Sequence, residues 1–120
     1  MGASVVTYQW GVFLASLDPS QGSEQAGRRP VLVISREQIN QVLPVVNVLP
    51  LTSRKSTQRV IYPNEVVLPA GTAGLPQESI VLCYQVRTLD KRRLVRLLGE
   101  LLDMSLRADV VEAIRFQLEV

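Results

Sequence analysis

Histidine is absent from this chain of 120 residues, and cysteine occurs only once, at Cys83. Without imidazole the chain lacks the usual general base near neutral pH and the commonest transition-metal ligand. A lone cysteine cannot form an internal disulfide, and its apolar surroundings from 80 to 83 predict a buried, unreactive thiol. The sequence also lacks clustered Asp and Glu, so we expect neither a metal nor any other cofactor.

Long apolar runs are missing as well, since no stretch of about 18 apolar residues occurs. The start from Met1 to Ser4 lacks the basic residues and apolar stretch of an export signal. We therefore expect a cytoplasmic protein without membrane contact. The net charge is only +2, so any site for nucleic acid must come from a local cluster of cations.

What is present fits one folded domain spanning residues 1–120. Hydrophobic residues make up 47% of the chain and charged residues 20%, close to the averages of folded proteins. A chain of this length has room for a single modest core. Glycines and prolines are dispersed at turns and do not gather into a linker.

Apolar and β-branched runs predict short strands. Pro44 and Pro50 predict an edge, a bulge or a strand end near Pro50, because proline cannot donate to a ladder. Turns are expected at Asp18-Pro19 and around Gly71, Gly74 and Pro76. The basic stretch 91–93 fits either a strand or a helix. The strands are expected at 8–17, 30–34, 45–51, 59–62, 65–68 and 79–86.

The end of the chain predicts an amphipathic helix, with Asp103 or Ser105 as its N-cap. Its apolar residues recur every four positions, at Leu106, Val110, Ile114 and Leu118, with Val111 beside them. Short strands followed by one terminal helix predict a mainly β fold, namely a small, mostly antiparallel barrel with the helix packed outside it.

The loop before the second predicted strand carries one carboxylate and two guanidinium groups, from Glu24, Arg28 and Arg29. Arginine offers permanently charged, bidentate donors to phosphate oxygens, and Glu24 could accept a proton or orient a hydroxyl. Ser23 and Gln25 add polar groups to the same loop. The composition also fits an ordinary solvated loop.

Two hydroxyls follow the third predicted strand, at Thr52 and Ser53. They could bind a phosphate oxygen or relay a proton, although such pairs also commonly form turns. A serine triad is disfavoured, because no histidine can activate the serine.

A basic block follows the strand expected at 79–86, and it could track a nucleic-acid backbone. A solvated face or a salt-bridged edge is the alternative, favoured for Arg92, Arg93 and Arg96. Trp10, Tyr62 and Tyr84 could stack on bases or belong to the core or an interface. The block comprises Gln85, Arg87, Asp90, Lys91, Arg92, Arg93 and Arg96.

Together these segments resemble the MazF/PemK family of toxin ribonucleases. The resemblance runs through most of the chain and is most specific in the loop from Gly22 to Pro30. The matching segments are Leu17-Asp18-Pro19, the run from 22 to 33, Leu51-Thr52-Ser53 and the run from 85 to 94.

The resemblance implies an SH3-like antiparallel barrel, of the kind found in MazF-like and CcdB-like toxins, with a C-terminal helix. It further implies a homodimer, metal-independent cleavage of single-stranded RNA, and a cognate antitoxin with a disordered segment that folds on binding. Operator DNA would be reached only through the antitoxin. Catalysis falls on Arg29 and Thr52, Glu24 lies in the covering loop, and Gln85 lines the substrate groove.

The first strand departs from the family pattern. Family members commonly begin it with Arg-Gly-Asp or a near variant, whereas this chain has Gln9-Trp10-Gly11 and lacks both the arginine and the acid. Trp10 could therefore stack a base or pack at the rim.

We hypothesise that an RNA 2′-hydroxyl attacks the neighbouring phosphorus, leaving a 2′,3′-cyclic phosphate and a 5′-hydroxyl. Arg29 would stabilise the phosphorane, Thr52 would hold a phosphate oxygen, and Glu24 is a candidate base. The substrate-binding residues would be Ser23, Gln25, Arg28, Ser53, Gln85 and Arg87.

Two other functions fit the same barrel. One is a non-enzymatic poison of gyrase, which acts through a C-terminal helix; the tail from 116 to 120 lacks the tryptophan that such poisons place near the terminus. The other is a barrel that binds RNA or protein and has lost catalysis.

Overall fold

Strand β3 (Val45–Ser53) is the longest strand and organises the sheet. The computed structural model describes residues 6–120, so the expectation about an export signal at Met1 to Ser4 lies outside the described residues. The remaining elements are β1 (Gly11–Ser16), β2 (Arg28–Val33), α1 (Glu37–Asn40), β4 (Glu65–Leu68), the 3-10 turn η1 (Thr72–Gly74), β5 (Ser79–Leu82), β6 (Arg87–Asp90), the 3-10 turn η2 (Lys91–Arg93), β7 (Leu94–Glu100) and α2 (Met104–Leu118).

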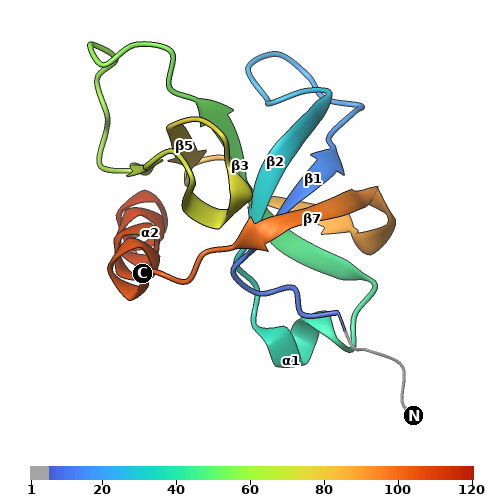
Figure 1. Cartoon of the computed structure of the whole chain (residues 1–120). Coiled ribbons are helices and arrows are strands. Elements are labelled where there is room, and N and C mark those ends of the chain that lie inside the picture. The colour runs from blue at the N-terminus through green and yellow to red at the C-terminus, as the bar shows by residue number, and fades with distance from the viewer. Residues whose placement is uncertain (1–5) are drawn as a thin grey trace.

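All strand pairs are antiparallel, in the order β4-β5-β3-β2-β1-β7, with β6 paired to β3. The first part of β3 pairs with β6 and β2, and its last three residues pair with β5 (Figure 1). Of the three alternatives predicted near Pro50, an edge, a bulge or a strand end, the strand end is wrong, because β3 continues to Ser53. Pro50 lies opposite Val31 at the last rung of the β2 ladder, just before β3 changes partner. A residue without an N–H is tolerated at such a change of partner.

The sheet curls until η1 touches β7, which closes the barrel. The contact is made by backbone, since a Cβ on Gly74 would lie 2.1 Å from the Leu98 carbonyl oxygen. A Cβ on Gly99 would lie 2.4 Å from the Ala73 carbonyl carbon. Gly74 also has a φ of 76°, which favours glycine. Together with α2, this arrangement confirms the expected small antiparallel barrel with a C-terminal helix.

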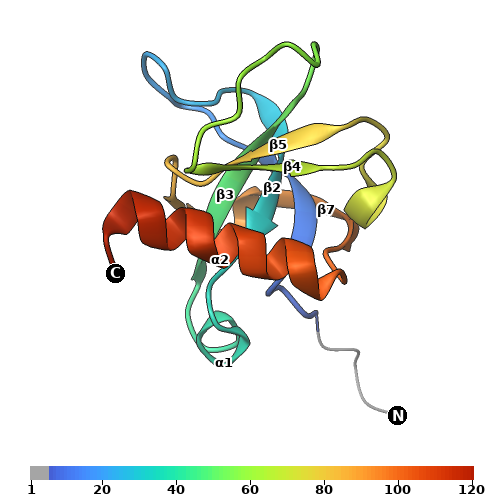
Figure 2. The ribbon, with the colours of Figure 1, turned by 90° about the vertical axis from the view of Figure 1, so that its left-hand side faces the viewer.

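Helix α2 covers one side of the barrel, where Val110 and Ala113 enter the core (Figure 2). Asp103 is the N-cap, since its carboxylate accepts hydrogen bonds from the N–H groups of Ser105 and Leu106 at 2.9 and 3.2 Å. The predicted helix is confirmed. Its buried stripe is shorter than the sequence suggested, because Leu118 is 53% exposed.

Several boundaries differ from the sequence predictions. Strand β1 begins at Gly11 instead of at residue 8. The strand expected at 59–62 is wrong; the segment is irregular and is held by an ion pair between Arg59 and Glu65. The strand expected at 79–86 ends at Leu82, where a turn begins. The open stretch 91–93 forms η2, and the strand β7 that follows it was not predicted.

Among residues 6–120, no helix combines the length and the apolar character needed to cross a membrane.

Candidate active site

A cleft of about 390 Å³ opens beside the loop between β1 and β2, which spans residues 17–27. Its walls come from that loop, from β3 and from the turn that joins β5 to β6. Polar groups dominate the loop side, whereas leucine, proline and valine side chains supply apolar surface. The lining residues are Leu17, Ser23, Glu24, Gln25, Pro50, Tyr84, Gln85, Val86 and Arg87.

The base of this loop is closed by one hydrogen bond between backbone groups and one from the backbone to a side chain. The Leu17 N–H donates to the Gly27 carbonyl at 2.9 Å, and the Gly27 N–H donates to the Asp18 carboxylate at 3.0 Å. Gly27 has a φ of 73°, in the left-handed region that favours glycine. The chain can therefore turn sharply and enter β2 directly with Arg28 and Arg29.

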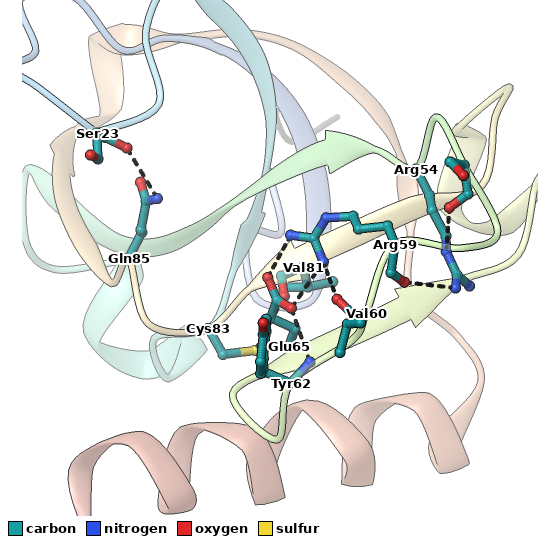
Figure 3. A network of polar contacts seen from close by, with 10 residues as sticks. Ser23, Arg54, Arg59, Val60, Tyr62, Glu65, Val81, Cys83 and Gln85 are labelled. Atoms are coloured by element: carbon teal, nitrogen blue, oxygen red, sulfur yellow. Dashed lines mark hydrogen bonds and ion pairs between the residues drawn. The ribbon is translucent and has the colours of Figure 1, made fainter.

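Two side chains from the opposite wall of the cleft hold the loop in place. The Gln85 carboxamide accepts a hydrogen bond from the Gln25 N–H at 3.1 Å. It also donates to the Ser23 carbonyl at 3.4 Å, as Figure 3 shows. The Arg87 guanidinium donates to the Pro19 carbonyl at 3.3 Å. The loop is therefore docked onto β6 and the turn that precedes it.

Glu24 lies in the wall of the cleft and is exposed. Its carboxylate accepts a hydrogen bond from the Gln21 N–H, and its own N–H donates to the Gln21 carbonyl at 3.1 Å. The carboxylate thus caps a tight turn within the loop.

Arg29 and Thr52 lie at the same end of the β2–β3 ladder. Each stands two residues beyond the rung that joins Val31 to Pro50, and residues two apart along a strand point to the same face. Arg29 is exposed and Thr52 is half-buried. Pro50 lines the cleft, whereas Arg29 and Thr52 lie on the strands beside it.

Arg29 and Thr52 both keep hydrogen-bonding groups that the described part of the chain does not use. The Arg29 Nε donates to the Ala26 carbonyl at 3.1 Å, and within residues 6–120 its two terminal nitrogens make no hydrogen bond. The Thr52 hydroxyl likewise makes none to that part of the chain. The oxygens of a phosphodiester can accept hydrogen bonds from a free guanidinium fork and from a free hydroxyl.

The structure therefore divides the residues predicted for the site into two groups. Leu17, Pro50 and Val86 were not predicted, because apolar residues at strand ends carry no signal of their own before the fold is known. The residues that line the cleft are Ser23, Glu24, Gln25, Gln85 and Arg87; those on the flanking strands β2 and β3 are Arg28, Arg29, Thr52 and Ser53.

The residues of the predicted basic block make several different contacts. Arg92 pairs with Asp90 at 3.0 Å, and the Lys91 ammonium lies 4.9 Å from the centre of the Tyr8 ring. The Arg93 guanidinium donates to the carbonyls of Ser16 and Asp18, so it supports the base of the loop from behind. Arg96 is exposed on β7. Of this block, Gln85 and Arg87 line the cleft, whereas Lys91 and Arg96 line a separate one.

Gln9 and Trp10, the unusual residues before β1, make contacts within the fold and do not line the cleft. The Gln9 side chain accepts a hydrogen bond from the Glu37 N–H at 3.0 Å, at the start of α1. The Arg107 guanidinium lies 5.2 Å from the Trp10 ring, which packs against the core. Of the three aromatic residues singled out from the sequence, only Tyr84 lines the cleft.

Cys83 is fully buried, as predicted, and burial raises the pKa of its thiol to about 12. Its thiol is therefore protonated and unreactive at neutral pH. Across the described range 6–120, no three acidic, cysteine or histidine side chains gather closely enough to hold a metal ion.

The chain is similar to known toxins over most of its length. A family model described as PemK-like, MazF-like toxin of type II toxin–antitoxin system matches residues 8–118. Endoribonuclease MazF of Staphylococcus saprophyticus is 38% identical over 96 residues, which cover 80% of this chain and 78% of that protein.

Solved structures agree with the sequence comparison. MazF from Deinococcus radiodurans superposes with a TM-score of 0.80 at 32% identity, covering 98% of this chain and 100% of that one. MazF in a MazE–MazF structure from the same organism has a TM-score of 0.72 at 28% identity, covering 96% and 97% of the two chains. The chain therefore belongs to the PemK-like, MazF-like toxins of type II toxin–antitoxin systems, a family of endoribonucleases.

Proposed function

We propose that this toxin cleaves single-stranded RNA by metal-independent transesterification at the rim of the cleft. The observation that carries the proposal is the register of β2 and β3, which brings Arg29 and Thr52 to one end and one face of the ladder beside Pro50. The guanidinium fork and the hydroxyl can both donate hydrogen bonds to the oxygens of a scissile phosphodiester.

The reaction begins when the 2′-hydroxyl of one nucleotide attacks the adjacent phosphorus. A bond forms between O2′ and phosphorus, the bond to O5′ breaks, and a proton passes to the leaving oxygen. The products are a 2′,3′-cyclic phosphate and a 5′-hydroxyl, and no water is consumed. Because the nucleophile belongs to the RNA, the protein needs only to position the strand and stabilise charge.

Arg29 would stabilise the negative charge that develops on the phosphorane, and Thr52 would hold a non-bridging oxygen. Arg29 is not the base, because a guanidinium stays protonated at ordinary pH. Glu24 is the candidate base, since its carboxylate lies in the wall of the cleft.

The remaining predicted residues would bind the strand. Ser23 and Gln25 line the cleft from the loop, and Arg28 and Ser53 flank it on β2 and β3. Gln85 and Arg87 line the cleft and also hold the loop, so they shape the groove as well as touching RNA.

We further propose a single cytoplasmic domain over residues 1–120 that works as a homodimer. A cognate antitoxin would neutralise it through a disordered segment that folds into the groove, and operator DNA would be bound only through that antitoxin. The MazE–MazF structure from Deinococcus radiodurans supports the expectation of an antitoxin.

End-mapping tests the chemistry directly. Purified protein is incubated with a mixed RNA in chelator, and the fragment ends are identified. We expect cuts within a short motif that leave 2′,3′-cyclic phosphate and 5′-hydroxyl ends, and no cut where the scissile nucleotide carries deoxyribose. Fragments with 5′-phosphate ends, or cleavage of the deoxyribose substrate, would overturn the proposal. Unchanged DNA supercoiling by gyrase in the same preparation separates this function from gyrase poisoning.

A further inference from the structure

Three strands lie side by side at the base of the loop 17–27, and one rung of the sheet crosses all of them. Ala15 of β1 is paired with Arg29 of β2 on one side and with Leu94 of β7 on the other. Arg93, the residue before Leu94, is half-buried and is the last residue of η2. Arg93 therefore stands two strands away from Arg29, at the same end of the sheet.

The Arg93 guanidinium holds the first part of the loop. One of its terminal nitrogens donates hydrogen bonds to the carbonyls of Ser16 and Asp18, and the bond to Ser16 measures 3.4 Å. These two residues lie where β1 ends and the loop begins. Arg93 thus fixes the backbone of Asp18 from the side of β7.

The Asp18 side chain passes this constraint to the far end of the loop. Its carboxylate accepts a hydrogen bond from the Gly27 N–H at 3.0 Å, and the same oxygen accepts one from the Ser20 hydroxyl at 3.4 Å. The carbonyl of Ala26, the residue before Gly27, accepts a hydrogen bond from the Arg29 Nε at 3.1 Å. The contacts of Asp18 and of Arg29 therefore meet at neighbouring residues.

The two contacts are made by opposite sides of a single peptide group, the one between Ala26 and Gly27. A peptide group is planar, so its C=O and its N–H turn together. Asp18 binds the N–H of this group, and Arg29 binds its C=O. A rotation that breaks the bond to Asp18 therefore also moves the acceptor of the Arg29 Nε.

We propose that Arg93 and Asp18 are positioning residues, which act through the peptide group between Ala26 and Gly27 to aim the Arg29 guanidinium at the scissile phosphate. The proposal rests on the function proposed above, in which Arg29 stabilises charge in the transition state. In the described part of the chain, the terminal nitrogens of Arg29 make no hydrogen bond, so the bond of its Nε orients the guanidinium. Neither Arg93 nor Asp18 has to touch RNA for this role.

A double-mutant cycle with Arg29 tests the proposal by kinetics. Arg93→Met keeps an unbranched stem and removes the donor, and it should lower kcat about tenfold to a hundredfold with KM unchanged, because small displacements of reacting groups are costly. In the Arg29→Ala background the same change should have no further effect, since the group that it positions is gone. Arg92→Met removes an equal charge from a neighbouring side chain that is 91% exposed, and it is the matched control.

Conservative variants separate hydrogen bonding from folding. Arg93→Lys keeps a charged donor and should recover part of the rate. Asp18→Asn keeps an oxygen that can accept from the Gly27 N–H and should retain most of the rate, whereas Asp18→Ala should lose as much as Arg93→Met. Circular dichroism checks that each variant folds, and if Arg93→Met does not fold, Arg93→Lys takes its place in the cycle. A loss of rate by the same factor with and without Arg29 would overturn the proposal.

A second measurement needs no cleavage. In heteronuclear NMR spectra the Arg29 Nε–H signal, assigned by its loss in Arg29→Lys, reports the bond to the Ala26 carbonyl. We expect this signal to shift in Arg93→Met and in Asp18→Ala and to keep its position in Arg92→Met. An Arg29 signal that is the same in all of these variants would overturn the positioning role. If the wild type cuts no RNA, or Arg29→Ala cuts as fast as the wild type, the proposed function fails, and the NMR signal still decides whether Arg93 and Asp18 orient Arg29.

Discussion

The Gln85 side-chain oxygen accepts a hydrogen bond from the Gln25 N–H at 3.1 Å, across 60 positions of sequence. The nitrogen of the same carboxamide donates to the Ser23 carbonyl at 3.4 Å. The oxygen and the nitrogen of this one side chain therefore both bond to the same loop. Since this loop carries Glu24 and leads into Arg29, its position decides where the proposed chemical groups stand. Gln85 is in this respect a positioning residue as well as part of the cleft wall.

Gln85→Ala should lower kcat/KM about a hundredfold, because small displacements of reacting groups are costly. Its effect on stability should be small, about 1 kcal/mol per lost hydrogen bond. Gln85→Glu keeps the acceptor for Gln25 but loses the donor to Ser23, so we expect an intermediate rate. Gln77→Ala, at an exposed glutamine outside the cleft, is the matched control. Full activity of Gln85→Ala would show that the loop holds its position without this side chain.

Arg29→Ala should reduce kcat by a factor of about 10² to 10³, the usual effect of removing a group that stabilises charge in a transition state. The melting temperature should not change, because Arg29 is exposed. Arg29→Lys should recover little activity, since an ammonium lacks the planar fork. Arg96→Ala removes an exposed cation from β7 and controls for net charge. Cleavage by Arg29→Ala at the wild-type rate would remove Arg29 from the mechanism.

Thr52→Val and Thr52→Ser separate the hydroxyl from the methyl group. Valine has nearly the same shape and no hydroxyl, so we expect kcat/KM to fall about tenfold or more with the fold intact. Serine keeps the hydroxyl and should retain most of the rate. The measurement is single-turnover cleavage of the mapped motif, with circular dichroism as the check on folding. The opposite order, an active valine variant and an inactive serine variant, would assign Thr52 to packing against its partner Ile80.

Glu65→Gln tests the ion pair between Arg59 and Glu65 through its pH dependence. Hydrogen bonds from Arg59 lower the pKa of Glu65 below its ordinary value, despite the opposing effect of burial. A carboxyl whose pKa is lower in the folded state adds stability above its unfolded pKa of about 4.3 and loses it as the pH falls through the folded value. The wild type should therefore be about 2 kcal/mol more stable than Glu65→Gln at pH 7, with a gap that narrows below about pH 4.

Urea unfolding at several pH values between 3 and 7 measures that gap. Glu112→Gln, at a carboxylate whose side chain is 74% exposed, should show no such trend. A constant difference between the wild type and Glu65→Gln across this range would mean that the charge of Glu65 does not contribute.

The barrel and its terminal helix could be predicted from the sequence, because alternating apolar residues and a four-residue apolar repeat report burial directly. Strand β7 was not predicted, since Leu94–Glu100 is an edge strand with several exposed residues and no clear alternation of burial. The segment 59–62 was wrongly predicted as a strand, because its apolar pattern is not matched by strand pairing. Its apolar residues suggest a strand, yet the Arg59–Glu65 ion pair and the bond from Tyr62 to Glu65 hold it in an irregular course.

For the site, motif residues on the loop and at strand ends were recognisable, whereas the contacts that arrange them were not. The docking of Gln85 onto Ser23 and Gln25 joins positions far apart in the chain, and no local pattern encodes it. The distribution of the basic block was also invisible in sequence. Arg93 supports the loop, Arg92 pairs with Asp90, and only the folded chain separates these uses.

The close approach of Gly74 and Gly99 also bears on how such a toxin loses its activity. One added methyl group at either position would collide with the opposing backbone where the barrel closes. Such a change lies away from the RNA, yet we expect it to abolish cleavage as completely as a change at Arg29. Bacteria that survive forced expression should therefore carry two kinds of mutation. A mutation of the first kind leaves the toxin folded and inactive, and such a toxin still binds its antitoxin. A mutation of the second kind unfolds the toxin and leaves the antitoxin without a partner.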